Sequence, residues 1–162
     1  MSSNNPNNIK DKVILVTGAL GQIGTEISTS FLIQGAKVIL TDINMNKKNT
    51  LIQKFNNEGI DKNNYLFLLL DILNEDNCKK VIQKSVNKFD RIDVLINNAA
   101  IDAKFDNENN SKINNSRFEN YPLDLLKNSV DVNLIGTIII TQVVCRQMLK
   151  QKHGNIINVA ST

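Results

Sequence analysis

The sequence of 162 residues has few of the side chains that build disulfide scaffolds or metal centres. Two cysteines, Cys78 and Cys145, and one histidine, His153, exclude a disulfide-rich fold and a cysteine-rich or multi-histidine metal site. The polar start MSSNNPNNIKDK lacks the apolar centre of a secretory signal, and no uninterrupted apolar run approaches the roughly 20 residues of a membrane span. We therefore expect a cytoplasmic protein with reduced thiols, no metal and no membrane attachment.

The charge balance is also nearly even. The chain has 19 Lys and Arg against 16 Asp and Glu, a formal net charge of +3 that is too weak and too scattered to indicate a nucleic-acid partner. Hydrophobic residues make up 41% of the chain, which is ordinary for a globular protein. This length suits one domain, so we expect a single domain over residues 1–162, with a disordered polar tail at residues 1–10.

Short β-branched apolar runs alternate with segments whose apolar residues recur at helical spacing. This alternation predicts an α/β fold: a doubly wound parallel sheet with helices on both faces. His153, just before Gly154, is expected to lie at a helix C-terminus and interact with the helix dipole. The strands are expected near residues 13–16, 38–40, 65–70, 92–96 and 156–159, and the helices near 23–35, 46–57, 74–88 and 123–150.

The first strand is followed by a glycine-rich turn, TGALGQIG, that opens the first helix. Glycine permits a tight turn and a close approach of backbone to a pyrophosphate, and the helix N-terminus offers free N–H groups to that anion. A glycine triple alone could be a structural turn, but its place at the first strand–helix junction favours a dinucleotide site. The candidate cofactor-binding residues here are Thr17, Gly18, Leu20, Gly21, Gln22, Ile23 and Gly24.

An acidic residue, Asp42, follows the second strand and is succeeded by Ile43. It lies near the spacing of about 20 residues that separates the glycine turn from the ribose-binding acid of dinucleotide sites. A carboxylate there accepts hydrogen bonds from ribose hydroxyls and repels a 2′-phosphate, so it favours NAD over NADP. The alternative is a helix cap or a solvated turn residue.

Taken in order, these segments resemble a short-chain dehydrogenase/reductase (SDR). The resemblance rests on TGALGQIG, Asp42, the pair Asp71-Ile72, the segment NNAA at 97–100, DVNLIGT at 131–137 and GNIINVAS at 154–161. It implies the N-terminal five strands of a Rossmann-fold domain, with Asp71 and Ile72 beside the adenine ring and Asn98, Ala99 and Ala100 beside the cofactor. By the same resemblance Asn133 and Ser161 would be catalytic: Asn133 orders a water in a proton relay, and Ser161 hydrogen-bonds the substrate oxygen.

Two features depart from the family pattern. The glycines have the spacing TG-x-x-G-x-x-G, which is commoner among nucleotide-sugar epimerases and dehydratases of the extended branch. The family's general acid/base, a Tyr in a Tyr-x-x-x-Lys motif beyond the serine, has no counterpart, since neither Tyr65 nor Tyr121 has a Lys four residues later. We therefore expect the N-terminal part of a reductase, truncated before that motif, with little or no turnover by itself.

The resemblance implies an NAD(P)-dependent oxidoreductase that moves a hydride between nicotinamide and a small carbonyl or alcohol substrate. The complete protein would be a homo-oligomer, a dimer or tetramer. The stretch from Ala100 to Asp124 resembles the loop of reductases of surface-sugar and flagellin modification, which suggests a sugar derivative as substrate. The alternatives are a non-catalytic NAD-binding module and an extended-branch nucleotide-sugar epimerase or dehydratase.

Overall fold

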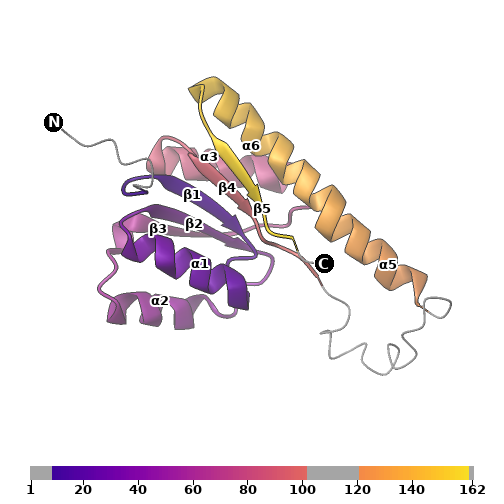
Figure 1. The fold of residues 1–162 in the computed structure, drawn as a ribbon, viewed down its shortest axis with the longest axis horizontal. Coiled ribbons are helices and arrows are strands. Elements are labelled where there is room, and N and C mark those ends of the chain that lie inside the picture. The colour runs from indigo at the N-terminus through magenta and orange to yellow at the C-terminus, as the bar shows by residue number, and fades with distance from the viewer. Residues whose placement is uncertain (1–8, 102–120, 161–162) are drawn as a thin grey trace.

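The computed structural model describes residues 9–101 and 121–160, which form a parallel sheet with helices on both faces (Figure 1). The strands are β1 (Val13–Thr17), β2 (Lys37–Asp42), β3 (Tyr65–Leu69), β4 (Val94–Asn97) and β5 (Asn155–Asn158). The helices are α1 (Gln22–Ile33), α2 (Lys48–Asn57), α3 (Glu75–Phe89), α5 (Leu123–Val130) and α6 (Thr137–Gln151), with a 3-10 turn η1 (Lys62–Asn64) and a π-helical segment η4 (Asp131–Gly136).

The strand order is β3-β2-β1-β4-β5, and every neighbouring pair is parallel. The chain proceeds outward from β1 to β3 and then returns to the other side of β1 with β4 and β5. This confirms the doubly wound α/β fold that the alternating pattern predicted. All five residues of β1 are buried, as expected of a central strand that is covered on both faces.

Two separate apolar cores cover the two faces of the sheet. Helices α3 and α6 pack on one face, where the buried side chains include Leu95, Ile140 and Val144. Helices α1 and α2 pack on the other face, where Phe55 is fully buried against the sheet. The local sequence accounts for helix α3. Its apolar residues form one stripe that packs on the sheet, and Asn74 caps its start by accepting a hydrogen bond from the Asn77 N–H at 2.9 Å.

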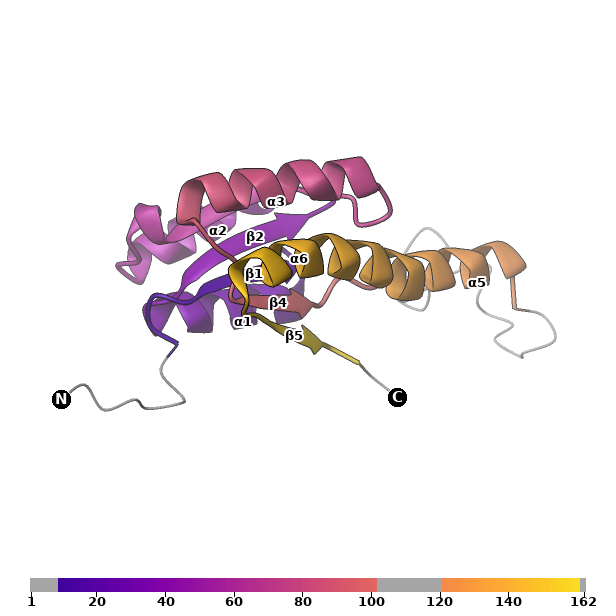
Figure 2. The ribbon, with the colours of Figure 1, turned by 90° about the horizontal axis from the view of Figure 1, so that it is seen from above.

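The C-terminal helices form one continuous rod, as the sequence predicted for residues 123–150, but the rod contains the π-helical segment η4. In both views α5 extends beyond the sheet (Figures 1 and 2). The most apolar 18-residue stretch of this rod, Leu123–Gln151, has a mean hydropathy of 1.4, and 28% of that stretch is buried. By length and composition alone the rod could cross a membrane. Polar residues interrupt the apolar ones along this helix, so the sequence shows no long apolar run there. A core helix of a soluble protein meets the same criteria, and α6 buries Ile140 and Val144 in the core.

The amino ends of the strands are held together by a carboxylate, Asp93. It accepts hydrogen bonds from the Val13 N–H at 2.8 Å and Arg91 Nε at 2.9 Å, and His153 Nε2 lies 2.9 Å away. Burial acts to raise the pKa of Asp93, but the hydrogen bonds from Val13, Arg91 and His153 and the Arg91 charge outweigh it and lower the pKa. His153 Nδ1 also lies 2.9 Å from the Gln151 carbonyl, at the end of α6 where the sequence placed this histidine.

Two expectations, the disordered tail at residues 1–10 and the segment 100–124, concern residues that the structure describes only in part. Ile9 and Lys10, assigned to a disordered tail, instead have defined positions: Ile9 packs on the core and accepts a hydrogen bond from the Lys12 N–H at 3.1 Å. The rest of that tail lies outside the described residues, as does most of the segment 100–124 on which the surface-sugar resemblance depended. Strand β5 forms one edge of the described sheet, and Ile157 remains 49% exposed.

Candidate functional site

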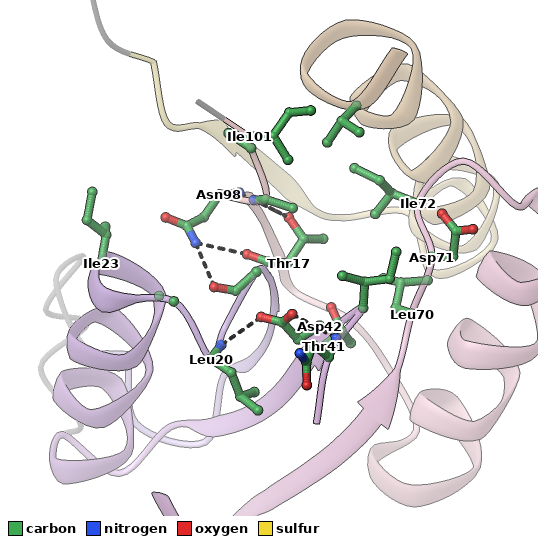
Figure 3. Close-up of a pocket in the computed structure, with 18 of the residues that line it drawn as sticks. Thr17, Leu20, Ile23, Thr41, Asp42, Leu70, Asp71, Ile72, Asn98 and Ile101 are labelled. Atoms are coloured by element: carbon green, nitrogen blue, oxygen red, sulfur yellow. Dashed lines mark hydrogen bonds between the residues drawn. The ribbon is translucent and has the colours of Figure 1, made fainter. Parts of the chain in front are cut away.

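A cavity of about 820 Å³ opens at the carboxyl ends of β1, β2 and β4. In a doubly wound sheet the chain leaves β1 and β4 in opposite directions, which creates a crevice where ligands bind. The fourteen candidate cofactor residues from the sequence all line this cavity. They are Thr17, Gly18, Leu20, Gly21, Gln22, Ile23, Gly24, Asp42, Ile43, Asp71, Ile72, Asn98, Ala99 and Ala100. Figure 3 shows how several of them, among them Thr17, Asp42 and Asn98, lie around it.

The glycine turn is built for close backbone contact. Gly18 has φ +61°, and a Cβ there would lie 2.8 Å from the Ala99 Cα. A Cβ on Gly24 would collide with the carbonyl oxygen of Gly18. Helix α1 starts at Gln22 after Gly21, and neither a capping side chain nor an acidic residue occupies its first turn. The N-terminal N–H groups of α1 therefore face the cavity with a positive partial charge and can bind an anion.

Asp42 joins the end of β2 to this turn. Its Oδ2 accepts a hydrogen bond from the Leu20 N–H at 3.0 Å, and its Oδ1 accepts one from the Asn44 N–H at 3.1 Å (Figure 3). Thr41, the residue before it, donates its hydroxyl to the Val16 carbonyl at 2.9 Å. The carboxylate is thus fixed at the cavity wall, with acceptor capacity left for hydroxyl groups of a ligand.

A brace between β1 and β4 shapes the centre of the cavity. The Thr17 hydroxyl oxygen accepts hydrogen bonds from the N–H groups of Asn98 and Ala99, each at 3.0 Å. In return, Asn98 Nδ2 donates to the carbonyl oxygens of Thr17 and Gly18, each at 3.0 Å (Figure 3). These four bonds hold the turn after β4 against the glycine turn.

The turn after β3 forms another wall of the cavity. Asp71 Oδ1 accepts a hydrogen bond from the Leu73 N–H at 2.9 Å, and Asn77 Oδ1 accepts one from the Asp71 N–H at 2.8 Å. Cys78 lies behind this turn, where burial and then the Asp71 charge raise the pKa of its thiol to about 11. The thiol therefore stays protonated at neutral pH and is not a nucleophile.

The structure describes one of the two candidate catalytic residues, Asn133. Asn133, in η4, does not line the cavity; its Oδ1 accepts a hydrogen bond from the Ile101 N–H at 2.9 Å and its Nδ2 donates to the Ile101 carbonyl at 3.0 Å. Its neighbour Val132 does line the cavity. Ser161 lies outside the described residues. Gly136, at the end of η4, lets the helix approach the cavity residue Ile72, because a Cβ there would lie 2.7 Å from the Ile72 side chain.

Sequence reasoning missed several residues of the cavity wall. Asn44, Asn46 and Lys47 follow Asp42, and their position after the second strand was the available signal. Ile101 and Val132 lie at the cavity wall where the Asn133 side chain bonds to the Ile101 backbone. No sequence pattern indicates that contact. The full set of additional lining residues is Thr41, Asn44, Asn46, Lys47, Leu70, Leu73, Ile101 and Val132.

The cavity combines a helix N-terminus that no side chain caps, a carboxylate and apolar walls. Its volume falls within the range of about 300–1,000 Å³ that small-molecule and cofactor pockets have. Gly18 and Gly24 leave room where any side chain would crowd the turn. The described residues therefore fit a dinucleotide with a pyrophosphate at α1 and a ribose at Asp42.

Comparisons with known proteins agree with this geometry. A sequence model of the family described as "short chain dehydrogenase" matches residues 12–162. The chain is 32% identical over 152 residues to acetoacetyl-CoA reductase of Acinetobacter sp. (strain RA3849), covering 94% of this chain and 56% of that protein. It is 34% identical over 155 residues to 3-oxoacyl-[acyl-carrier-protein] reductase FabG of Thermotoga maritima, again covering 94% of this chain and 56% of the relative.

Solved structures give the same result. The crystal structure of NAD+-bound xylitol dehydrogenase matches with a TM-score of 0.80 and 27% identity, over 94% of this chain and 54% of that one. Levodione reductase shares the fold with a TM-score of 0.81. The chain spans about half the length of the curated relatives it matches. The sheet order, the glycine turn with Asp42 and a family match over residues 12–162 lead to one assignment: this chain belongs to the short chain dehydrogenase family.

Proposed function

We propose that this chain is the nucleotide-binding part of an NAD-dependent oxidoreductase that transfers a hydride between nicotinamide and a carbonyl or alcohol group. The observation that carries the proposal is the placement of Asp42 against the glycine turn, with its carboxylate bonded to the Leu20 N–H at 3.0 Å. A negative charge there binds ribose hydroxyls and opposes the 2′-phosphate of NADP. The preference for NAD over NADP follows from that charge.

Each wall of the cavity has a proposed task. The α1 N-terminus at Gly21 and Gln22 binds the pyrophosphate, and Asp42 binds the adenosine ribose. The turn at Asp71 borders the adenine, and the turn at Asn98 borders the remainder of the cofactor. The remaining residues of the fourteen complete these walls through backbone and apolar contacts.

The bound nicotinamide supplies the hydride chemistry, and the protein orients it and manages the proton. We propose that Asn133 orders a water for proton movement, while its side chain holds the turn at Ile101. Ser161 is proposed to donate a hydrogen bond to the substrate oxygen.

The substrate and the assembly belong to the same proposal. Relatives named acetoacetyl-CoA reductase, 3-oxoacyl-[acyl-carrier-protein] reductase and 7alpha-hydroxysteroid dehydrogenase support a carbonyl or alcohol group as the reacting part of the substrate. Exposed Leu123, Val130, Leu134 and Ile138 along the C-terminal rod support a homo-oligomer. We further propose a single domain over residues 1–162 and a cytoplasmic location, where Cys78 and Cys145 would remain free thiols.

The experiment is calorimetric titration of the chain with NAD and with NADP, with folding checked by circular dichroism. We expect NAD to bind about tenfold or more tightly than NADP, because a charged hydrogen bond contributes about 1.5–3 kcal/mol. Asp42→Asn keeps an oxygen for the Leu20 N–H but removes the charge, so it should weaken NAD binding and improve NADP binding. Asp61→Asn is the matched control, since Asp61 also accepts a backbone N–H bond, from Asn63 at 2.9 Å, but lies outside the cavity. A folded chain that binds neither nucleotide, or binds both equally, would contradict the proposal.

A further inference from the structure

A small polar cluster joins β4, β5 and α6 at the carboxyl ends of β4 and β5, around one buried side chain. Asn97, the last residue of β4, is 5% exposed. Its Nδ2 donates hydrogen bonds to the Thr141 hydroxyl oxygen on α6 at 2.9 Å and to Asn158 Oδ1 on β5 at 2.8 Å. Asn158 is its partner in the parallel register, and the Asn97 carbonyl accepts the Val159 N–H at 2.9 Å. One side chain therefore links three elements.

The same helical rod is attached to the β4 segment at a second point. Asn133 is bonded through both side-chain atoms to the backbone of Ile101, four residues beyond Asn97. The Thr137 hydroxyl donates to the Asn133 carbonyl at 3.0 Å, between the two attachments. Two attachments on one rod, at Asn133 and Thr141, fix both its position along the strand and its rotation. The π-helical segment with Val132 lies at one of them.

The hydrogen bonding of Asn97 indicates a role beyond filling space. Its Oδ1 is one of two buried side-chain polar atoms without a partner among the described residues. A buried amide with an unpaired oxygen contributes less to stability than a fully bonded one, and an aliphatic side chain of similar size would avoid that cost. What an aliphatic side chain cannot supply is direction: only the amide holds the Thr141 hydroxyl and Asn158 in one fixed arrangement.

We propose that Asn97 is a positioning residue for the reaction. Through Thr141 it sets the helix that carries Asn133, and through Asn158 it sets the carboxyl end of β5, three residues before Ser161 along the chain. Asn97 itself does not line the cavity, whereas Ala99, Ala100, Ile101 and Val132, which this arrangement places, do. The inference rests on the proposed function, because the position of Asn133 matters for chemistry only if the cavity holds the cofactor.

The test is residue-resolved amide hydrogen exchange on the whole chain, with Thr141→Val as the main variant. This change removes the hydroxyl that accepts from Asn97 with little change in shape, and Thr141→Ser keeps it. We expect Thr141→Val to speed exchange about tenfold at the amides of Val159 and Ile101 and to leave the Ala19 amide, bonded to the Thr41 carbonyl at 2.9 Å, unchanged. Thr141→Ser should restore the original rates.

Thr29→Val is the control, since the Thr29 hydroxyl is also hydrogen-bonded but lies on α1, where it donates to the Thr25 carbonyl. It should leave the Val159 and Ile101 rates as they were. Unchanged rates in Thr141→Val, or the same acceleration at every amide including Ala19, would overturn the proposal, since the latter marks a purely global loss of stability. NAD titration separates the two proposals: a folded parent chain that does not bind NAD refutes the proposed function, whereas the exchange comparison decides whether Asn97 controls the arrangement.

Discussion

Replacing Thr17 by Val should loosen the cavity without changing the volume of the core. Thr17 is 2% exposed, and its hydroxyl oxygen accepts the N–H groups of Asn98 and Ala99, each at 3.0 Å. Valine has nearly the same shape but cannot accept, so both N–H groups would lose their partner. A buried donor left unpaired costs about 1–3 kcal/mol, and these two are only partly buried, so about 1 kcal/mol each is appropriate. The expected loss is therefore about 2 kcal/mol in the free energy of unfolding.

The assay is urea denaturation followed by circular dichroism, because the chain has no tryptophan for fluorescence. Thr17→Ser is the control: it keeps the acceptor and removes only a methyl group, so it should cost less than the valine variant. NAD affinity should also fall in Thr17→Val, because Asn98 and Ala99 line the cavity. Equal stability of the valine and serine variants would refute the reasoning, since the two differ in that hydroxyl.

Two further changes test other parts of the structure. Gly24→Ala should destabilise the chain by about 1–3 kcal/mol and weaken NAD binding, because its Cβ would collide with the Gly18 carbonyl. Gly21→Ala, whose Cβ would lie 3.3 Å from the same oxygen, should do less, and a reversed order in urea midpoints would refute this account. Asp93→Asn should cost about 1–2 kcal/mol at neutral pH through weaker bonding to the Val13 N–H. Because the folded-state pKa of Asp93 is lowered, its stabilisation is present above the ordinary value of 3.8 and is lost as the pH falls through the folded value. Urea midpoints of the two chains should therefore converge on acidification, and a constant difference down to low pH would contradict the assignment.

The sequence by itself determined the fold class and the position of the cavity. Both follow from local patterns: the strands are short apolar runs, the helices have apolar stripes, and a parallel sheet brings all carboxyl ends to one edge. Gly18, Asp42, Asp71 and Asn98 each lie at or just after the end of a strand, so their convergence required only the strand order. These residues line one cavity for that reason.

Tertiary structure alone decided which side chains are bonded to one another across that edge. The link from Asn97 to Thr141 and Asn158, and the contact of Asp93 with His153, join residues 44 to 61 positions apart. Hydrogen bonds depend on distances of a few tenths of an ångström and on direction, which are set by the packing of helices on the sheet. The close approach of Gly136, at the end of the π-helical segment, to Ile72 is likewise a contact between residues far apart in the sequence. Periodicity in the sequence specifies which face a residue is on, but not which partner it meets there.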